Sequence, residues 1–186
     1  MRILLIQITF FLVIPICFIY IALRLMFIKK FKIEIKKEII RLSCLSYISY
    51  LISIVWINPV GTLNYIPINL IPLGTILSYF NDFGSGHLSY SIIVSNLLGN
   101  ILLTLPLGFF IFYKYRNLKL GQVFILSFAL PIIIELVQLS LHFMQLGTRV
   151  VDIDDVILNM LGIILGYYLT KFLFQRNQLK LIRLSR

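Results

Sequence analysis

The chain has 186 residues, of which 60% are hydrophobic and 13% are charged, and its mean hydropathy is +0.98. This composition excludes an ordinary soluble domain and is typical of membrane proteins with several spans. The net charge of +10 does not indicate a nucleic-acid partner, because the basic residues cluster beside the ends of apolar segments.

Five apolar segments are each long enough to cross a bilayer as a helix. A span needs about 20 residues, because a helix rises about 1.5 Å per residue. We therefore predict an all-α, polytopic membrane protein with a single membrane domain over residues 1–186. The expected transmembrane helices cover residues 3–27, 39–57, 91–113, 120–141 and 153–174. The first is expected to be an anchor helix, because it is too long for a signal peptide and no small-residue cleavage site follows it.

The basic residues predict the orientation of these helices. Every Lys and Arg except Arg2 and Arg149 lies in residues 24–41, 114–119 or 171–186. Because short connections rich in Lys and Arg stay in the cytoplasm, all three regions should face inward. Five spans then place the N-terminus outside and the C-terminus inside.

The long outer connection, from about residue 58 to residue 90, is unusual in composition. Its proline and glycine residues are expected to interrupt any continuous helix. The apolar pieces between them are too short to span and too hydrophobic for an ordinary exposed loop. We expect this segment to lie in the membrane interface or to fold back over the bundle, as a candidate lid over an outward-facing pocket.

Polar residues on three helices are expected at a similar depth. Asn96 and Asn100 lie one turn apart on the third span, and Glu135 and Gln138 share a face of the fourth. Asn96, Glu135 and Asn159 each lie about six residues, or roughly 9 Å, from the outer end of their span. Asparagines at such positions also form simple interhelical hydrogen bonds, so a purely structural role stays open for them.

The start of the last span holds three of the seven acidic residues. Asp152, Asp155 and Asn159 fall within an arc of about 80°, whereas Asp154 points away from it and is expected only to cap the helix. Gly162 and Gly166 continue the arc and should let a neighbouring helix approach closely.

Arg149 is the only cation expected among these outer carboxylates, so it could pair with Glu135 or bind an anionic ligand. The remaining negative charge would suit an amine or a hard divalent cation. No ligand spacing here is diagnostic of a metal, and we predict neither a metal nor a cofactor.

Over about residues 47–170 the chain resembles the VanZ-like family of membrane proteins. The residues that carry the resemblance are Asn69-Leu70-Ile71-Pro72 with Thr75-Ile76, Asn96, Asn100, Pro106-Leu107-Gly108-Phe109, Glu135, Gln138, Arg149, Asp152, Asp154-Asp155, Asn159 and Gly162. Val151 and Leu73 replace residues that are commonly aromatic in the family, and both changes stay apolar. The resemblance implies an accessory factor in resistance to glycopeptide antibiotics, notably teicoplanin, and no established reaction.

We therefore expect a multi-pass protein of the bacterial cytoplasmic membrane that modulates how the cell envelope interacts with glycopeptides. Its partners would be membrane lipids and an envelope precursor or the antibiotic, in an oligomeric state that the sequence leaves open. The alternative is a membrane-embedded enzyme that acts on a lipid-linked envelope precursor, with Glu135 or Asp155 as general acid or base. The residues expected to bind the ligand are Asn96, Asn100, Glu135, Gln138, Arg149, Asp152, Asp155 and Asn159.

Overall fold

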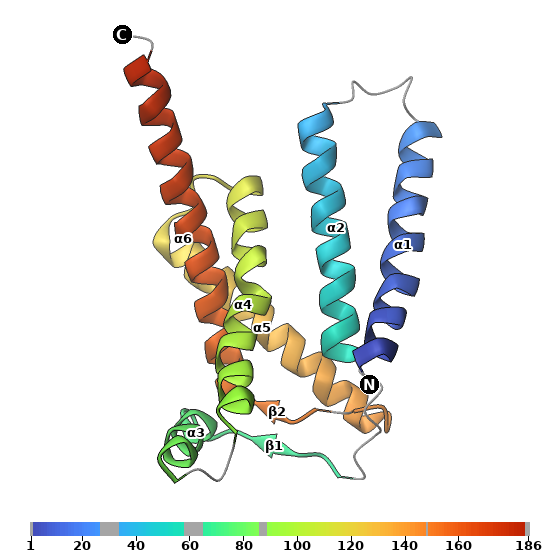
Figure 1. Cartoon of the computed structure of the whole chain (residues 1–186), viewed down its shortest axis with the longest axis vertical. Helices are drawn as coiled ribbons and strands as arrows, with labels where there is room; N and C mark the ends of the chain where they lie inside the picture. Colours follow the sequence, from blue (N-terminus) through green and yellow to red (C-terminus); the bar gives the residue numbers. More distant parts are fainter. Residues whose placement is uncertain (1, 27–33, 58–64, 86–88, 148, 185–186) are drawn as a thin grey trace. The chain divides into compact units, whose positions relative to one another are not determined.

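The computed structural model describes residues 2–26, 34–57, 65–85, 89–147 and 149–184. These ranges contain six helices and two strands of two residues each (Figure 1). The elements in chain order are α1 (Arg2–Met26), α2 (Ile35–Trp56), β1 (Ile68–Asn69), α3 (Gly74–Ser85), α4 (Tyr90–Lys114), α5 (Leu120–Phe143), β2 (Val151–Asp152) and α6 (Ile153–Leu184).

The helices confirm the predicted all-α, polytopic membrane fold. Four of the described helices are long and apolar enough to cross a membrane: α2, α4, α5 and the Ile153–Arg176 part of α6. The first predicted span corresponds to α1, whose described apolar part Leu12–Met26 is shorter than these four, so the fifth span stays a prediction. Pro106 and Pro131 lie inside α4 and α5 without ending either helix.

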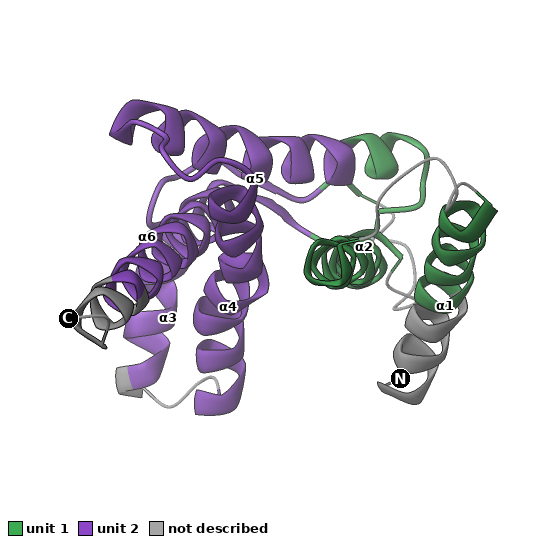
Figure 2. Cartoon of the chain, turned by 90° about the horizontal axis from the view of Figure 1, so that it is seen from above, with its two compact units in different colours: residues 1–66, 140–149 green, residues 67–139, 150–186 purple. Residues whose placement is uncertain are grey.

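The chain forms two compact units (Figure 2). Unit 1 comprises Met1–Ile66 and Ser140–Arg149, and unit 2 comprises Pro67–Leu139 and Val150–Arg186. The prediction of one membrane domain stays a prediction, and each unit is described by itself below.

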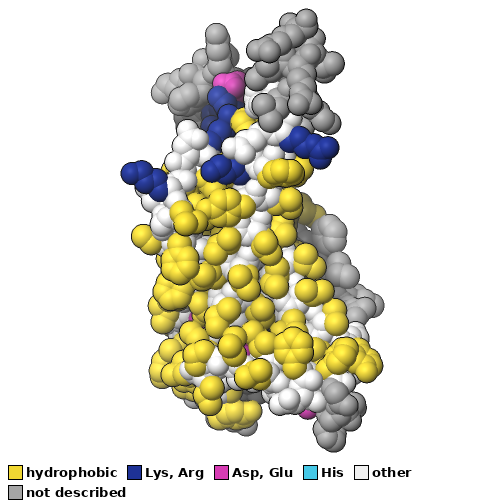
Figure 3. Space-filling model, turned by 90° about the vertical axis from the view of Figure 1, so that its left-hand side faces the viewer, with side chains coloured by type: hydrophobic (Ala, Val, Ile, Leu, Met, Phe, Trp, Pro, Cys, Tyr) yellow, Lys and Arg dark blue, Asp and Glu magenta, His cyan; other side chains and the backbone are white. Residues whose placement is uncertain are grey.

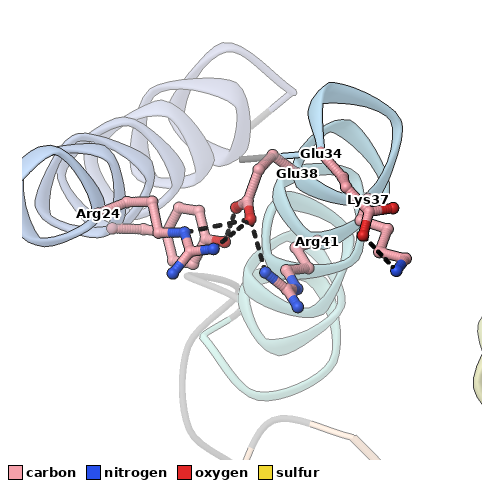
Figure 4. Close-up of polar contacts among 6 residues, drawn as sticks. Arg24, Glu34, Lys37, Glu38 and Arg41 are labelled. Atoms are coloured by element: carbon pink, nitrogen blue, oxygen red, sulfur yellow. Dashed lines mark hydrogen bonds and ion pairs between the residues drawn. The ribbon is translucent and has the colours of Figure 1, made fainter. Parts of the chain in front are cut away.

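In unit 1, α1 packs against α2. A carboxylate joins the two helices, because Glu38 of α2 accepts hydrogen bonds from Tyr20 and Arg24 of α1 at 2.5 and 2.8 Å (Figure 4). Arg41 donates to the same carboxylate from one turn away, at 2.6 Å. The helix α2 begins four residues before the predicted span and so includes Glu38.

In unit 2, α4 packs closely along α6. A Cβ atom on Gly162 or Gly166 would overlap a main-chain carbonyl oxygen of α4, and one on Gly108 would overlap the backbone of α6. The prediction that the α6 glycines allow close approach is therefore confirmed. Towards the other end of this contact, Phe112 and Tyr167 form a core with Val123 of α5.

Unit 2 has a basic end and a polar end. The Tyr167 hydroxyl lies 3.3 Å from the Tyr115 carbonyl oxygen, and the Arg116 guanidinium lies over the Phe174 ring at 4.8 Å. These contacts bring the connection between α4 and α5 beside the basic second half of α6, as the predicted orientation requires. Figure 3 shows Lys and Arg gathered towards one end of a face that is otherwise largely hydrophobic. We call the opposite end, where α6 begins, the outer end.

The outer connection differs from prediction, because Gly74–Ser85 form the helix α3. Pro72 and Gly74 do not interrupt this helix. They lie at its start, where the first amides need no partner within the helix. The connection also contains β1, which pairs in parallel with β2 in the register Ile68 to Val151 and Asn69 to Asp152. These two strands tie the connection to the start of α6.

Candidate functional site

The outer end of unit 2 gathers polar residues from six elements, a group that we call the outer polar cluster. Its members are Asn69, Thr75, Asn100, Glu135, Gln138, Asp152, Asp154, Asp155 and Asn159. They fall into four sets, which hold the outer connection, join α5 to the segment that leads into α6, join α4 to α6, or have a buried polar atom with no hydrogen-bond partner among the described residues.

Asp152 holds the outer connection in place. Its carboxylate accepts hydrogen bonds from the Asn69 amide at 3.1 Å and from the Thr75 hydroxyl at 2.6 Å. It also accepts the main-chain N–H of Asp154 at 2.9 Å. The carboxylate is buried, so these donors replace the water that it loses. A ligand that binds Asp152 must therefore compete with three existing donors.

Asp154 differs from its expected role as a cap of its own helix. Its carboxylate accepts the main-chain N–H groups of Leu73 and Ile76 at 2.6 and 3.1 Å, and so caps the start of α3. The Asp154 side chain is buried in protein and only 1% exposed, and its partners lie in the same segment as those of Asp152. Sequence analysis omitted Asp154 from the site, because its partners lie about 80 residues earlier in the chain.

Glu135 joins the cluster from α5. Buried residues of α5 recur at Val123, Ser127, Pro131, Glu135 and Gln138. These five positions lie within an arc of about 120°, so they form one stripe that faces the protein. Glu135 is 6% exposed, and its Oε2 atom accepts the main-chain N–H of Asp152 at 3.2 Å. The carboxylate thus contacts the segment that leads into α6.

Asn100 and Asp155 form a polar contact between α4 and α6. The Asn100 side-chain amide donates to the Asp155 carboxylate. One turn further along α4, the Thr104 hydroxyl lies 2.9 Å from the main-chain carbonyl oxygen of Asn159. Thr104 was not predicted as a site residue. The glycine packing beneath these contacts brings the two backbones close enough for them to form.

Two buried amide oxygens of the cluster have no hydrogen-bond donor among the described residues. They are Oε1 of Gln138 on α5 and Oδ1 of Asn159 on α6. Both side chains are 5% exposed. An unsatisfied buried acceptor is costly, and such a group commonly indicates a missing donor such as a ligand or water. These two oxygens are therefore the atoms of the cluster best placed to accept a hydrogen bond from a ligand.

The two remaining predicted residues have other described contacts. Asn96 is exposed on α4, and its amide donates to the Tyr79 hydroxyl of α3 at 2.7 Å. Arg149 belongs to unit 1, where its carbonyl oxygen contacts Nε2 of His142. The pairing of Arg149 with the carboxylates of unit 2 stays a prediction. Asn69 and Thr75 belonged to the resemblance, but sequence analysis did not assign them to the site.

In the described part of the chain, no three His, Cys, Asp or Glu side chains form a group that could hold a metal ion. The chemistry that the described cluster offers is hydrogen bonding, from carboxylate and amide oxygens at the outer end of an apolar bundle. This arrangement defines an all-helical, multi-pass membrane protein with a polar cluster at one end of its helices.

Residues 10–175 match the sequence profile of the VanZ/LLP1 family, so the chain belongs to that family and is a VanZ-like membrane protein. The match is wider than the expected region of residues 47–170 and includes most of α1. No curated protein and no solved structure matches the chain.

Proposed function

We propose that this protein is an accessory factor of the bacterial cytoplasmic membrane that modulates how the envelope interacts with glycopeptide antibiotics. It would act by binding an envelope lipid, a precursor headgroup or the antibiotic at its outer polar cluster. The observation that carries the proposal is the pair of unsatisfied buried oxygens on Gln138 and Asn159. Membership of the VanZ/LLP1 family supports a role at the cell envelope. The position of the cluster at the outer end supports action on the outer side of the membrane.

The expected roles follow from the chemistry of each group. Gln138 and Asn159 would accept hydrogen bonds from hydroxyl or amine groups of the ligand. Glu135 and Asp155 would add charge-assisted hydrogen bonds, and Arg149 would hold a phosphate or carboxylate through two parallel hydrogen bonds. The outer connection would cover the bound group, as a lid that Asp152 and Asp154 hold on the protein.

The proposal is tested by the teicoplanin susceptibility of cells that express the wild type or single variants at equal membrane level. The informative variants are Gln138→Met, Asn159→Leu, Glu135→Gln and Arg149→Ala. Ile133→Met is the control, because Ile133 is exposed outside the buried stripe of α5. Protection by the wild type and Ile133→Met alone would support the proposal. Equal protection by all variants would contradict a role for the cluster, and no protection by the wild type would contradict the antibiotic role.

A membrane-embedded enzyme is the second candidate, favoured by the burial of Glu135. A carboxylate held at a fixed position in an apolar bundle can serve as general acid or base. The two hypotheses are distinguished by incubating the purified protein with a radiolabelled fraction of lipid-linked precursors and measuring whether product forms. Product that is lost in Glu135→Gln would support the enzyme, whereas binding without product would support the accessory role.

A further inference from the structure

Helix α3 lies across the outer ends of α4 and α6. Figure 1 shows α3 nearly end-on where α4 and α6 run lengthwise, and Figure 2 shows it lengthwise. It is tied to α4 by the hydrogen bond between Asn96 and Tyr79, and to α6 by the two amides that Asp154 accepts. A helix held crosswise at the ends of spans lies at the depth of the lipid headgroups and the first acyl carbons.

The surface of α3 divides into three faces. Thr75 and Tyr79 are partly buried and form polar contacts with β2 and α4. Leu77 and Phe80 are 57% and 64% exposed and lie about 60° apart on a second face. Ser78 and Asn81 are exposed on a third face, about 60° apart from each other. The helix therefore presents separate protein-facing, apolar and polar sides.

The apolar face of α3 meets an apolar stripe of α4. The rings of Phe83 and Tyr90 contact each other at 4.5 Å between centroids. From Tyr90 the exposed residues Val94, Leu98 and Leu102 follow at intervals of four, along one side of a helix that is long enough to span. This stripe is the surface that a spanning helix turns towards lipid, and the α3 face continues it at the outer end.

We propose that α3 is an interfacial helix that inserts Leu77 and Phe80 among the acyl chains of outer-leaflet lipids. Three observations carry this assignment: the crosswise position, the separation of apolar from polar exposed residues, and the continuity with the α4 stripe. A helix with these properties lies in the interface with its apolar side sunk about 5–10 Å into the boundary between headgroups and acyl chains. The partner is the lipid surface itself, so the inference goes beyond the proposed function and does not depend on it.

The test is fluorescence of single tryptophans in the full-length protein reconstituted into phosphatidylglycerol and phosphatidylethanolamine vesicles. Trp56 is the only native tryptophan, so a Trp56→Phe background is silent. Leu77→Trp and Phe80→Trp report on the apolar face, and Ser78→Trp and Asn81→Trp are matched controls on the polar face. Two quenchers are compared: lipids brominated on the acyl chain, and acrylamide in the water.

We expect Leu77→Trp and Phe80→Trp to have blue-shifted emission and to lose fluorescence to brominated lipid. Ser78→Trp and Asn81→Trp should instead lose fluorescence mainly to acrylamide. Equal quenching of all four variants by acrylamide would place α3 in water and overturn the proposal. Protection of Leu77→Trp and Phe80→Trp from both quenchers would also overturn it, because protein, such as a second copy of the chain, would then cover the face.

Discussion

Asp154 accepts the main-chain N–H of Leu73 at 2.6 Å, across 81 residues of sequence. Leu73 has a φ of 64°, in the left-handed region that non-glycine residues rarely adopt. The second oxygen of the same carboxylate accepts the N–H of Ile76 at 3.1 Å. One side chain of α6 thus satisfies two of the free amides at the start of α3 and fixes the turn that precedes it.

Asp154→Ala should release the start of α3. The substitution leaves two amides without their buried acceptor, at a cost of about 1–3 kcal/mol. We expect a lower thermal unfolding temperature of the purified protein and faster proteolysis within residues 65–85. Asn81→Ala, on the exposed polar face of α3, is the control and should change neither. Unchanged proteolysis in Asp154→Ala would show that the strands β1 and β2 hold the connection without the cap.

Leu73→Gly should be tolerated, unlike most substitutions to glycine. A left-handed backbone costs a non-glycine residue roughly 1–2 kcal/mol, which glycine avoids. Glycine also gives the unfolded chain more freedom, a cost of about 0.4–1 kcal/mol, so we expect unchanged or slightly higher stability. Leu70→Gly is the matched control, because Leu70 is exposed without a positive φ and should lose stability. Equal losses in both variants would show that Leu73 is not strained.

Gly166→Ala should weaken the contact between α4 and α6. A Cβ atom there would overlap the Leu105 carbonyl oxygen, and backbone cannot move aside as a flexible side chain can. We expect a loss of about 1–3 kcal/mol, measured as unfolding in a mixed-micelle titration. Gly99→Ala is the control within α4, since a Cβ atom on Gly99 meets no atom within 4 Å. It should raise stability by about 0.5–1 kcal/mol through helix propensity. The idea of close packing fails if the two variants behave alike.

The spans and the glycine contact could be predicted because both follow from local patterns. Long apolar runs define the helices, and Gly162 and Gly166 lie one turn apart on one face of α6. The helix α3 could not be found in this way, since Pro72 and Gly74 usually mark the end of regular structure. Here they lie at the start of a helix that Asp154 caps from a distant segment. Helical periodicity set Asp154 apart from Asp152 and Asp155, but it could not predict the distant amides whose hydrogen bonds Asp154 accepts.

Glu38→Gln should separate the helices of unit 1. The substitution removes the negative charge with which both Arg24 and Arg41 form ion pairs. The glutamine amide also accepts fewer hydrogen bonds than the carboxylate does. We expect a lower unfolding temperature of the purified protein. Glu34→Gln is the control, because its pair with Lys37 lies exposed on one helix, where ion pairs contribute little. If the two variants unfold at the same temperature, the contact between α1 and α2 rests on apolar packing alone.

Gln138→Met should keep or raise the stability of the ligand-free protein, because the amide oxygen it removes has no donor in the described structure. Replacing an unsatisfied buried acceptor by an apolar group of similar shape removes a cost of about 1–3 kcal/mol. Thr104→Val is the comparison variant, because it removes a hydroxyl that has a hydrogen-bond partner. The Thr104 hydroxyl lies 2.9 Å from the Asn159 carbonyl oxygen, and losing this hydrogen bond should cost about 0.5–1.5 kcal/mol of stability. The thermal unfolding temperatures of the two purified variants distinguish a ligand-binding role of Gln138 from a structural one. A loss of stability in Gln138→Met as large as that in Thr104→Val would give Gln138 a structural role and remove the main support for a ligand at the cluster.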